Sequence, residues 1–409
     1  MFKNIFLSNT SIIFRYIGSF IVTIVIARTY SKESFGVYQL ALSTLAIMEN
    51  IFFFSPQHLK LHLVKAPNDE SRVYSAWTFQ AIVLFLFNLI FALGGYLGSG
   101  EDLHLYWVTL LILVFRTAFR HMDYVQIIAD SRLRNDIVQK EQLASISIFN
   151  LSRFLLTYFN YSIFALSSAS IIQGLSSSAY QYSWKKYLQL NFQFKFEFPF
   201  FWSLMKSGGL LSFVALMNIL QSRFLSFLVV ERISFSEFSD LQLTLKLVEP
   251  ISALGTVAMV SNFTLLSNSF LYREKGFRKG FLRTAVIAVG IATIVSVLVL
   301  LIPKDLILIV LGDGYRAVVD DLWIGCLVAI VTVIFSVATL NNQIQKKYLQ
   351  MLLKSLLTGF LYVVGTQILM SEINTQKLLW LLVVVPLVSI IAVDAPFYIV
   401  NKRNKFLRR

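Results

Sequence analysis

Continuous apolar runs of about 20 residues recur along the whole chain, and they constrain the fold more than any other feature. Segments such as "AIVLFLFNLIFAL" and "LLVVVPLVSIIAV" carry no charge. A hydrocarbon core of about 30 Å needs about 20 helical residues to cross it, so each run predicts a transmembrane helix. The runs do not show the alternating pattern of a membrane β-barrel. We therefore expect an all-α polytopic membrane protein.

Twelve spans can be placed on the sequence, and the even number puts both termini on one side of the membrane. The first span is expected to stay in the mature chain, because it is long and has an arginine at its centre. The predicted spans are residues 4–29, 34–62, 73–98, 105–127, 141–160, 163–184, 203–230, 234–268, 281–303, 318–341, 348–370 and 377–400.

Composition supports a membrane protein and explains the basic charge. Hydrophobic residues make up 56% of the chain and charged residues 14%, against roughly 25% charged in soluble proteins. The formal net charge is +14, but the basic residues gather in the loops on one side of the spans. This asymmetry follows the positive-inside rule, so both termini are predicted to be cytoplasmic and no nucleic-acid partner is needed. The opposite side carries few basic residues, namely Arg28, Lys32, Arg232, Lys304, Arg316 and Lys377.

An internal repeat predicts two halves of six helices each. A shift of 203 residues aligns "SFGVYQLALSTL" from Ser34 with "EFSDLQLTLKLV" from Glu237. The offset is half the chain, and it also brings the first span onto the seventh. We therefore expect an N-terminal bundle over 1–190 and a C-terminal bundle over 191–409, an arrangement that is far commoner in transporters than in membrane enzymes.

Charged side chains in the middle of predicted spans are the candidate functional groups, since charge in hydrocarbon is costly. Cations exceed anions there, which favours a hydrated cationic cavity for an anionic substrate, because arginine binds diphosphate through paired, charge-assisted hydrogen bonds. The alternative is pairing, in particular of Lys246 with Glu249 three residues later. Lys354 and Asp394 lie nearer the cytoplasmic end and are expected to snorkel. The candidate cations are Arg15, Arg116, Arg153, Arg223 and Lys246, and the anions are Glu49 and Glu249.

Small-residue stretches and a proline within a span are expected to have structural roles. Stretches such as "SALGTVAMVSNFTLLSNS" are rich in small and hydroxylated residues, which suit close helix packing, although a wet lining that passes sugars is the alternative. Pro56 is expected to kink the second span, with a gate as the alternative.

No nucleotide-binding, zinc-protease or serine-hydrolase motif occurs, and the single cysteine excludes a disulfide framework. The sequence thus favours a carrier without enzymatic activity or a cofactor.

Two segments resemble polysaccharide flippases. In "IVIARTYSKESFGVYQLALS", from Ile24 to Ser43, an Ala-Arg pair, a polar turn and Phe-Gly-x-Tyr link the first two helices as they do in that family. "ILIVLGDGYRAVVDDLWIG" resembles the family's segment before helix ten. Thr29-Tyr30-Ser31 replaces the family's usual Leu-Gly-Pro, so the subfamily is left open.

The resemblance implies a Wzx-type flippase in the polysaccharide branch of the multidrug/oligosaccharidyl-lipid/polysaccharide exporter (MOP) superfamily, with a MATE-like fold. Its cargo would be an undecaprenyl-diphosphate-linked oligosaccharide, such as an O-antigen or capsule unit. Transport would cross the bacterial inner membrane by alternating access, with proton or sodium coupling. Membrane lipids, a polysaccharide polymerase and chain-length proteins are the implied partners. A drug/cation antiporter of the same superfamily and a glycan polymerase or ligase are the alternatives.

Overall fold

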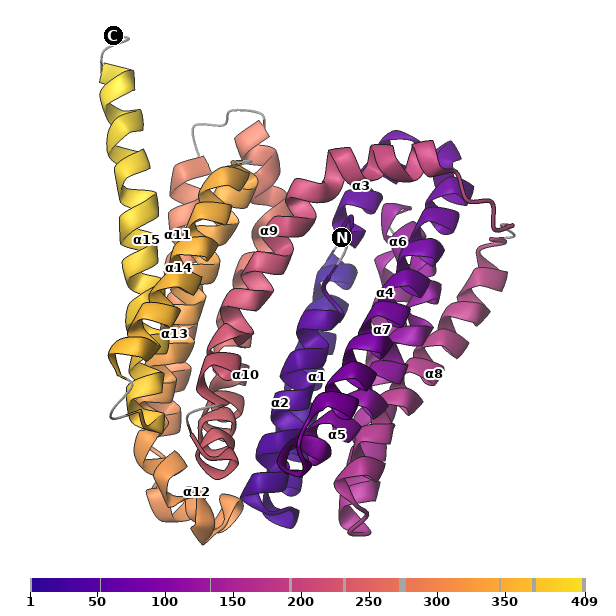
Figure 1. The fold of residues 1–409 in the computed structure, drawn as a ribbon. Coiled ribbons are helices and arrows are strands. Elements are labelled where there is room, and N and C mark those ends of the chain that lie inside the picture. The colour runs from indigo at the N-terminus through magenta and orange to yellow at the C-terminus, as the bar shows by residue number, and fades with distance from the viewer. Residues whose placement is uncertain are drawn as a thin grey trace. The chain divides into compact units, whose positions relative to one another are not determined.

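The computed structural model describes residues 2–51, 53–132, 134–190, 193–230, 233–271, 277–345, 347–369 and 373–406. Within these ranges every regular element is a helix (Figure 1), which confirms the predicted all-α class. Each of the twelve predicted spans overlaps one or more helices. Six helical stretches are long and apolar enough to cross a membrane by length and composition: Pro67–Gly98, His104–Ser131, Phe277–Leu300, Asp313–Ile344, Tyr348–Ile368 and Thr375–Asp394.

The chain separates into two compact units, Met1–Ile219 and Leu220–Arg409. The sequence placed the division near residue 190, whereas the structure divides inside α9 (Phe198–Val230). The reason is that Phe201 and Leu204, from the first turns of α9, pack into the apolar core of the N-terminal unit.

The N-terminal unit contains two spans that are not continuous α-helices. The second span is split into α2 and α3, and the fourth span contains a nine-residue 3₁₀ segment, η3, between α5 and α6. The elements are α1 (Phe2–Thr29), α2 (Lys32–Met48), α3 (Pro56–Lys65), η1 (Pro67–Asp69), α4 (Glu70–Gly98), η2 (Glu101–Leu103), α5 (His104–Val114), η3 (Phe115–Asp123), α6 (Tyr124–Ser131), α7 (Asn135–Tyr158) and α8 (Ile163–Tyr187).

Pro56 marks a break of the second span and not the kink that was expected. It occupies the first turn of α3, where its missing N–H costs nothing, and the Ser55 side chain caps that helix by accepting a hydrogen bond from the His58 N–H. The described residues between the two helices, 49–51 and 53–55, are therefore not helical.

The C-terminal unit is built from longer uninterrupted helices, and α10 packs against α11 and α13. A Cβ on Gly255 of α10 would lie 2.9 Å from the carbonyl oxygen of Ala288 on α11, so this small residue permits close backbone approach. That contact supports the packing interpretation of the "SALGTVAMVS" stretch. The elements after α9 are α10 (Phe235–Leu271), α11 (Phe277–Leu300), α12 (Lys304–Leu311), η4 (Asp313–Tyr315), α13 (Arg316–Ile344), α14 (Tyr348–Ile368) and α15 (Thr375–Phe406).

The starts of α2 and α10, which the 203-residue shift aligns, are capped in the same way. Ser31 caps α2 by accepting a hydrogen bond from the Ser34 N–H, and Ser234, 203 residues later, accepts one from the Glu237 N–H. The matched residues Phe35 and Phe238 are both fully buried.

Polarity in the N-terminal unit is inverted relative to a soluble protein. On α4, Ile90 and Leu97 are 69% and 81% exposed, whereas Gln80 and Asn88 are 1% exposed. Apolar side chains therefore face outward, as they do toward lipid, and the amides face the interior. The chain is a multi-pass membrane protein.

Candidate functional site

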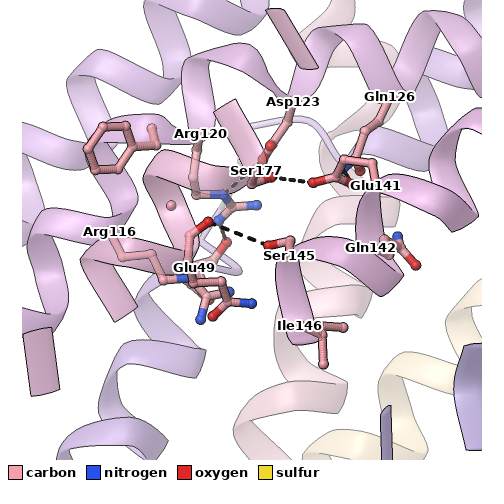
Figure 2. Close-up of a pocket in the computed structure, with 13 residues that line it drawn as sticks. Glu49, Arg116, Arg120, Asp123, Gln126, Glu141, Gln142, Ser145, Ile146 and Ser177 are labelled. Atoms are coloured by element: carbon pink, nitrogen blue, oxygen red, sulfur yellow. Dashed lines mark hydrogen bonds and ion pairs between the residues drawn. The ribbon is translucent and has the colours of Figure 1, made fainter. Parts of the chain in front are cut away.

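A charged cavity of about 260 Å³ lies inside the N-terminal unit (Figure 2). Its walls come from the end of α2, from η3, and from α6, α7 and α8. Five ionisable side chains line it, together with three glutamines, two serines, Phe119, Ile146 and Gly174. The ionisable residues are Glu49, Arg116, Arg120, Asp123 and Glu141.

Glu49 follows the last turn of α2, where an acid faces the negative end of the helix dipole. Two arginines compensate for this placement. Arg116 Nε lies 3.2 Å from Glu49 Oε1, and Arg120 donates a hydrogen bond to the Glu49 carbonyl oxygen. Both guanidinium groups therefore bind the end of the broken second span.

The 3₁₀ geometry of η3 decides how its charged residues pair. Residues three apart eclipse each other in a 3₁₀ helix. Arg120 accordingly meets Asp123, with 3.4 Å between Nε and Oδ2, and Gln181 Nε2 donates to the other Asp123 oxygen at 3.2 Å. Asp123 thus has a cation on one oxygen and an amide on the other.

Glu141 differs from the other two carboxylates. It is 2% exposed, and both of its contacts in the described structure are with neutral donors, the Gln126 amide and the Ser177 hydroxyl. The cavity therefore holds three carboxylates and two guanidinium groups, which leaves one negative charge over when all five are ionised. A proton or a monovalent cation on this carboxylate would remove the excess charge.

Gly174 sets one wall of the cavity. A Cβ at this position of α8 would lie 2.5 Å from the Phe119 ring, so a glycine lets Phe119 pack directly on the helix backbone.

The predicted cations lie at separate positions in the structure. Arg116 lies in the cavity with Glu49, while Lys246 pairs with Glu249 on α10 with 2.7 Å between Nζ and Oε2. Arg223 is half-buried on α9 and has a partner. The side chain of Arg15 lies outside the described residues.

Arg153 on α7 is in a different setting. It is 3% exposed, and its guanidinium carbon lies 5.0 Å from the Phe149 ring centre and 5.8 Å from that of Tyr38. Its Nε has no hydrogen-bond partner within the described structure. Aromatic rings contact the group here, and no carboxylate among the described residues does so.

Lys354 and Asp394 do not snorkel as expected. Lys354 is 1% exposed and its Nζ lies 3.2 Å from Asp394 Oδ2, while Asn342 Nδ2 donates to the other oxygen at 2.9 Å. Depth counted along one helix predicted snorkelling wrongly, because α13 and α15 cover this face of α14.

The sequence interpretation missed Arg120, Asp123 and Glu141. Two of them lie in the η3 segment, and Glu141 begins its predicted span at the membrane edge. The cluster "RTAFRHMD" and the later "QKEQ" were a usable signal, since together they place five charged residues and two amides in the fourth predicted span and at the start of the fifth.

Comparison with protein-family models and with curated proteins returns no match. Solved structures do match. An inward-facing multidrug resistance MATE family transporter of the MOP superfamily aligns with a TM-score of 0.73 at 11% identity, over 96% of this chain and 95% of that one. Lipid II flippase MurJ in an inward closed conformation aligns at 0.70 and 15% identity, over 96% and 87%. An outward-facing MATE transporter aligns at 0.66 and 11% identity, over 95% and 93%.

The chain has the fold of MATE and MurJ transporters. This fold agrees with the predicted MATE-like architecture. At these identities the likeness is one of fold, and it does not select a substrate.

Proposed function

We propose that the chain is a flippase that moves an undecaprenyl-diphosphate-linked oligosaccharide, such as an O-antigen or capsule unit, across the bacterial inner membrane by alternating access. The candidate groups for the diphosphate are Arg15, Arg116, Arg153, Arg223 and Lys246. The polyprenyl tail would stay in the bilayer.

Arg153 is the observation that carries the proposal. A guanidinium group at membrane depth without a carboxylate partner is costly, so it is a functional candidate by default. Its contacts in the described structure are with aromatic rings, and its Nε has no hydrogen-bond partner there, so a planar guanidinium group suited to bidentate bonds with an anion is held without a carboxylate among the described residues. A diphosphate offers the oxygens that such a group binds.

The fold gives independent support. One of the similar structures is described as a lipid II flippase, and the alignment spans nearly all of this chain. A lipid-linked cargo on the same fold is thus physically feasible.

Transport in this proposal is coupled to protons or sodium through the charged cavity. Glu141 is the strongest coupling group, because its carboxylate is buried among neutral donors. Glu49 lines the same cavity, so the binding of a proton or a sodium ion at Glu141 would change the electrostatic environment of Glu49. Glu249, paired with Lys246, is the weaker candidate.

A drug/cation antiporter is the second candidate. It is favoured by the excess of carboxylates over arginines in the cavity, the opposite of the cationic excess predicted for mid-span residues. A MATE transporter is also among the similar structures. The two candidates differ in the charge of the cargo.

A transport assay distinguishes the flippase from the antiporter. It uses purified protein in proteoliposomes under an imposed proton or sodium gradient. A fluorescent short-chain polyprenyl-diphosphate oligosaccharide and a cationic dye would be offered in parallel. We expect the lipid to change leaflet and the Arg153→Met variant to lose this activity, while Arg132→Met, which removes a surface arginine paired with Glu70, keeps it. Movement of the dye and not of the lipid would replace the flippase with the antiporter.

A further inference from the structure

One turn of α4 satisfies the backbone of two discontinuous spans at once. The first discontinuity is the gap between α2 and α3, and the second is the 3₁₀ segment η3. Gln80 and Trp77, three residues apart on α4, each reach one of them. Neither side chain is charged, and both are almost completely buried.

Gln80 holds the gap in the second span. Its Oε1 accepts hydrogen bonds from the N–H groups of Phe53 and Phe54 at 3.0 and 3.1 Å, and its Nε2 lies 3.4 Å from the Phe54 carbonyl oxygen. Backbone groups outside a helix at membrane depth need such partners, because no lipid atom can supply them. This one side chain therefore satisfies three backbone groups that lie outside the helices.

Trp77 holds the fourth span. Its Nε1 donates to the Arg120 carbonyl oxygen at 2.9 Å, in a 3₁₀ run much longer than the three to four residues that are usual. Long 3₁₀ stretches in the middle of a span often mark hinges.

Arg120 joins the two discontinuities to the charged cavity. Its carbonyl accepts from Trp77. Its guanidinium group donates to the Glu49 carbonyl oxygen and pairs with Asp123, and Figure 2 shows these three residues at the cavity. A displacement of either discontinuity therefore moves the charged groups that line the cavity.

We propose that Gln80 and Trp77 are positioning residues: they hold the start of α3, at Phe53 and Phe54, and η3 as a paired hinge that sets where Glu49, Arg116 and Arg120 stand during transport. This inference rests on the proposed transport function. Alternating access requires a few residues that absorb backbone rotation, and two non-α-helical segments at one level can bend without breaking intact helices. The α4 side chains restore the same geometry after each cycle.

Hydrogen exchange of the protein in nanodiscs tests the contacts. In Gln80→Met the amides of Phe53 and Phe54 lose their acceptor, so we expect them to exchange about tenfold faster. The control is Thr78→Val on the same turn of α4, which removes a buried hydroxyl that has no partner in the described structure. Equal exchange in Gln80→Met and in the control would overturn the inference.

Transport tests the positioning role. We expect Gln80→Met and Trp77→Phe each to slow lipid flipping about tenfold at normal protein level, a loss that corresponds to one hydrogen bond. Trp107→Phe, which removes an indole N–H without a partner in the described structure, is the matched control. Flipping at the control rate in both variants would show that the hinge role is wrong.

The two proposals can fail separately. If the wild-type protein moves the cationic dye and not the lipid, the proposed cargo is wrong, and the same variants assayed with the dye still decide the positioning role. Trp77→Phe also covers the case in which Gln80→Met does not fold, because it keeps most of the aromatic core.

Discussion

The two units begin alike and then diverge. Ser31 and Ser234 cap α2 and α10 in the same way, yet α2 has 17 residues and α10 has 37. The neighbouring helices also differ. α4 supplies Gln80 to a broken partner, whereas α11 contains no asparagine or glutamine in its 24 residues. In the described structure α10 runs on through Pro250, and α11 offers it no amide that could act as Gln80 does.

The arrangement of charged side chains also differs between the two units. The N-terminal unit gathers charged groups around a cavity, whereas Lys246 and Lys354 in the C-terminal unit are each paired with a nearby carboxylate. The N-terminal unit therefore combines ion pairs with a carboxylate, Glu141, that has only neutral contacts among the described residues, whereas each of these two lysines in the C-terminal unit has its own carboxylate.

The largest effect is expected on stability, at the buried pair of the C-terminal unit. Lys354→Met leaves Asp394 without its cation, and losing one partner of a buried pair costs about 3 to 5 kcal/mol. Thermal unfolding in detergent measures this loss. Lys354→Met combined with Asp394→Asn should recover most of it, because no unpaired charge is left buried. If the double variant loses as much stability as the two single variants added together, the ion pair does not explain the loss.

The next effect is on coupling, at the cavity of the N-terminal unit. Glu141→Gln keeps the shape of the side chain and removes its charge. Gradient-driven transport should fall about 10- to 100-fold, since a hydrogen bond to a charged group is worth about 1.5 to 3 kcal/mol. Gradient-free exchange of cargo should fall much less, and protein level should not change. If the variant still responds fully to the gradient, the coupling group lies elsewhere.

The smallest effect is expected at Lys246. This residue and Glu249 form a pair three residues apart on one helix, and such pairs contribute about 0.2 to 0.5 kcal/mol. Lys246→Met should therefore change stability little and slow transport less than Arg153→Met. A loss of transport equal to that of Arg153→Met would move the anion site toward the C-terminal unit.

Hydropathy predicted the spans well, because burial in lipid requires long apolar helices whatever their packing. It could not predict the gap between α2 and α3, since apolar residues such as Phe53 and Phe54 score equally well inside and outside a helix. The bonds that permit the gap come from Gln80, an uncharged residue 26 positions away. Counting depth along single helices also missed that Lys354 is covered by neighbouring helices.

The sequence predicted only part of the charged site, again because tertiary packing decides the surroundings of each charged group. Glu49 and Arg116 stand out in apolar runs, but Glu141 looks like an ordinary interfacial acid until tertiary packing surrounds it with Gln126 and Ser177. The excess of positive charge inferred from mid-span residues likewise depended on which charged groups pack together.

Binding of the lipid carrier without its sugar tests the central claim most directly. Native mass spectrometry would compare a polyprenyl diphosphate with the matching polyprenol on the wild-type protein and on Arg153→Met. We expect the diphosphate to bind the wild type at least about tenfold more tightly than the alcohol, and Arg153→Met to lose this preference. Equal binding of the two lipids to the wild type would contradict recognition of an anionic cargo by these cations.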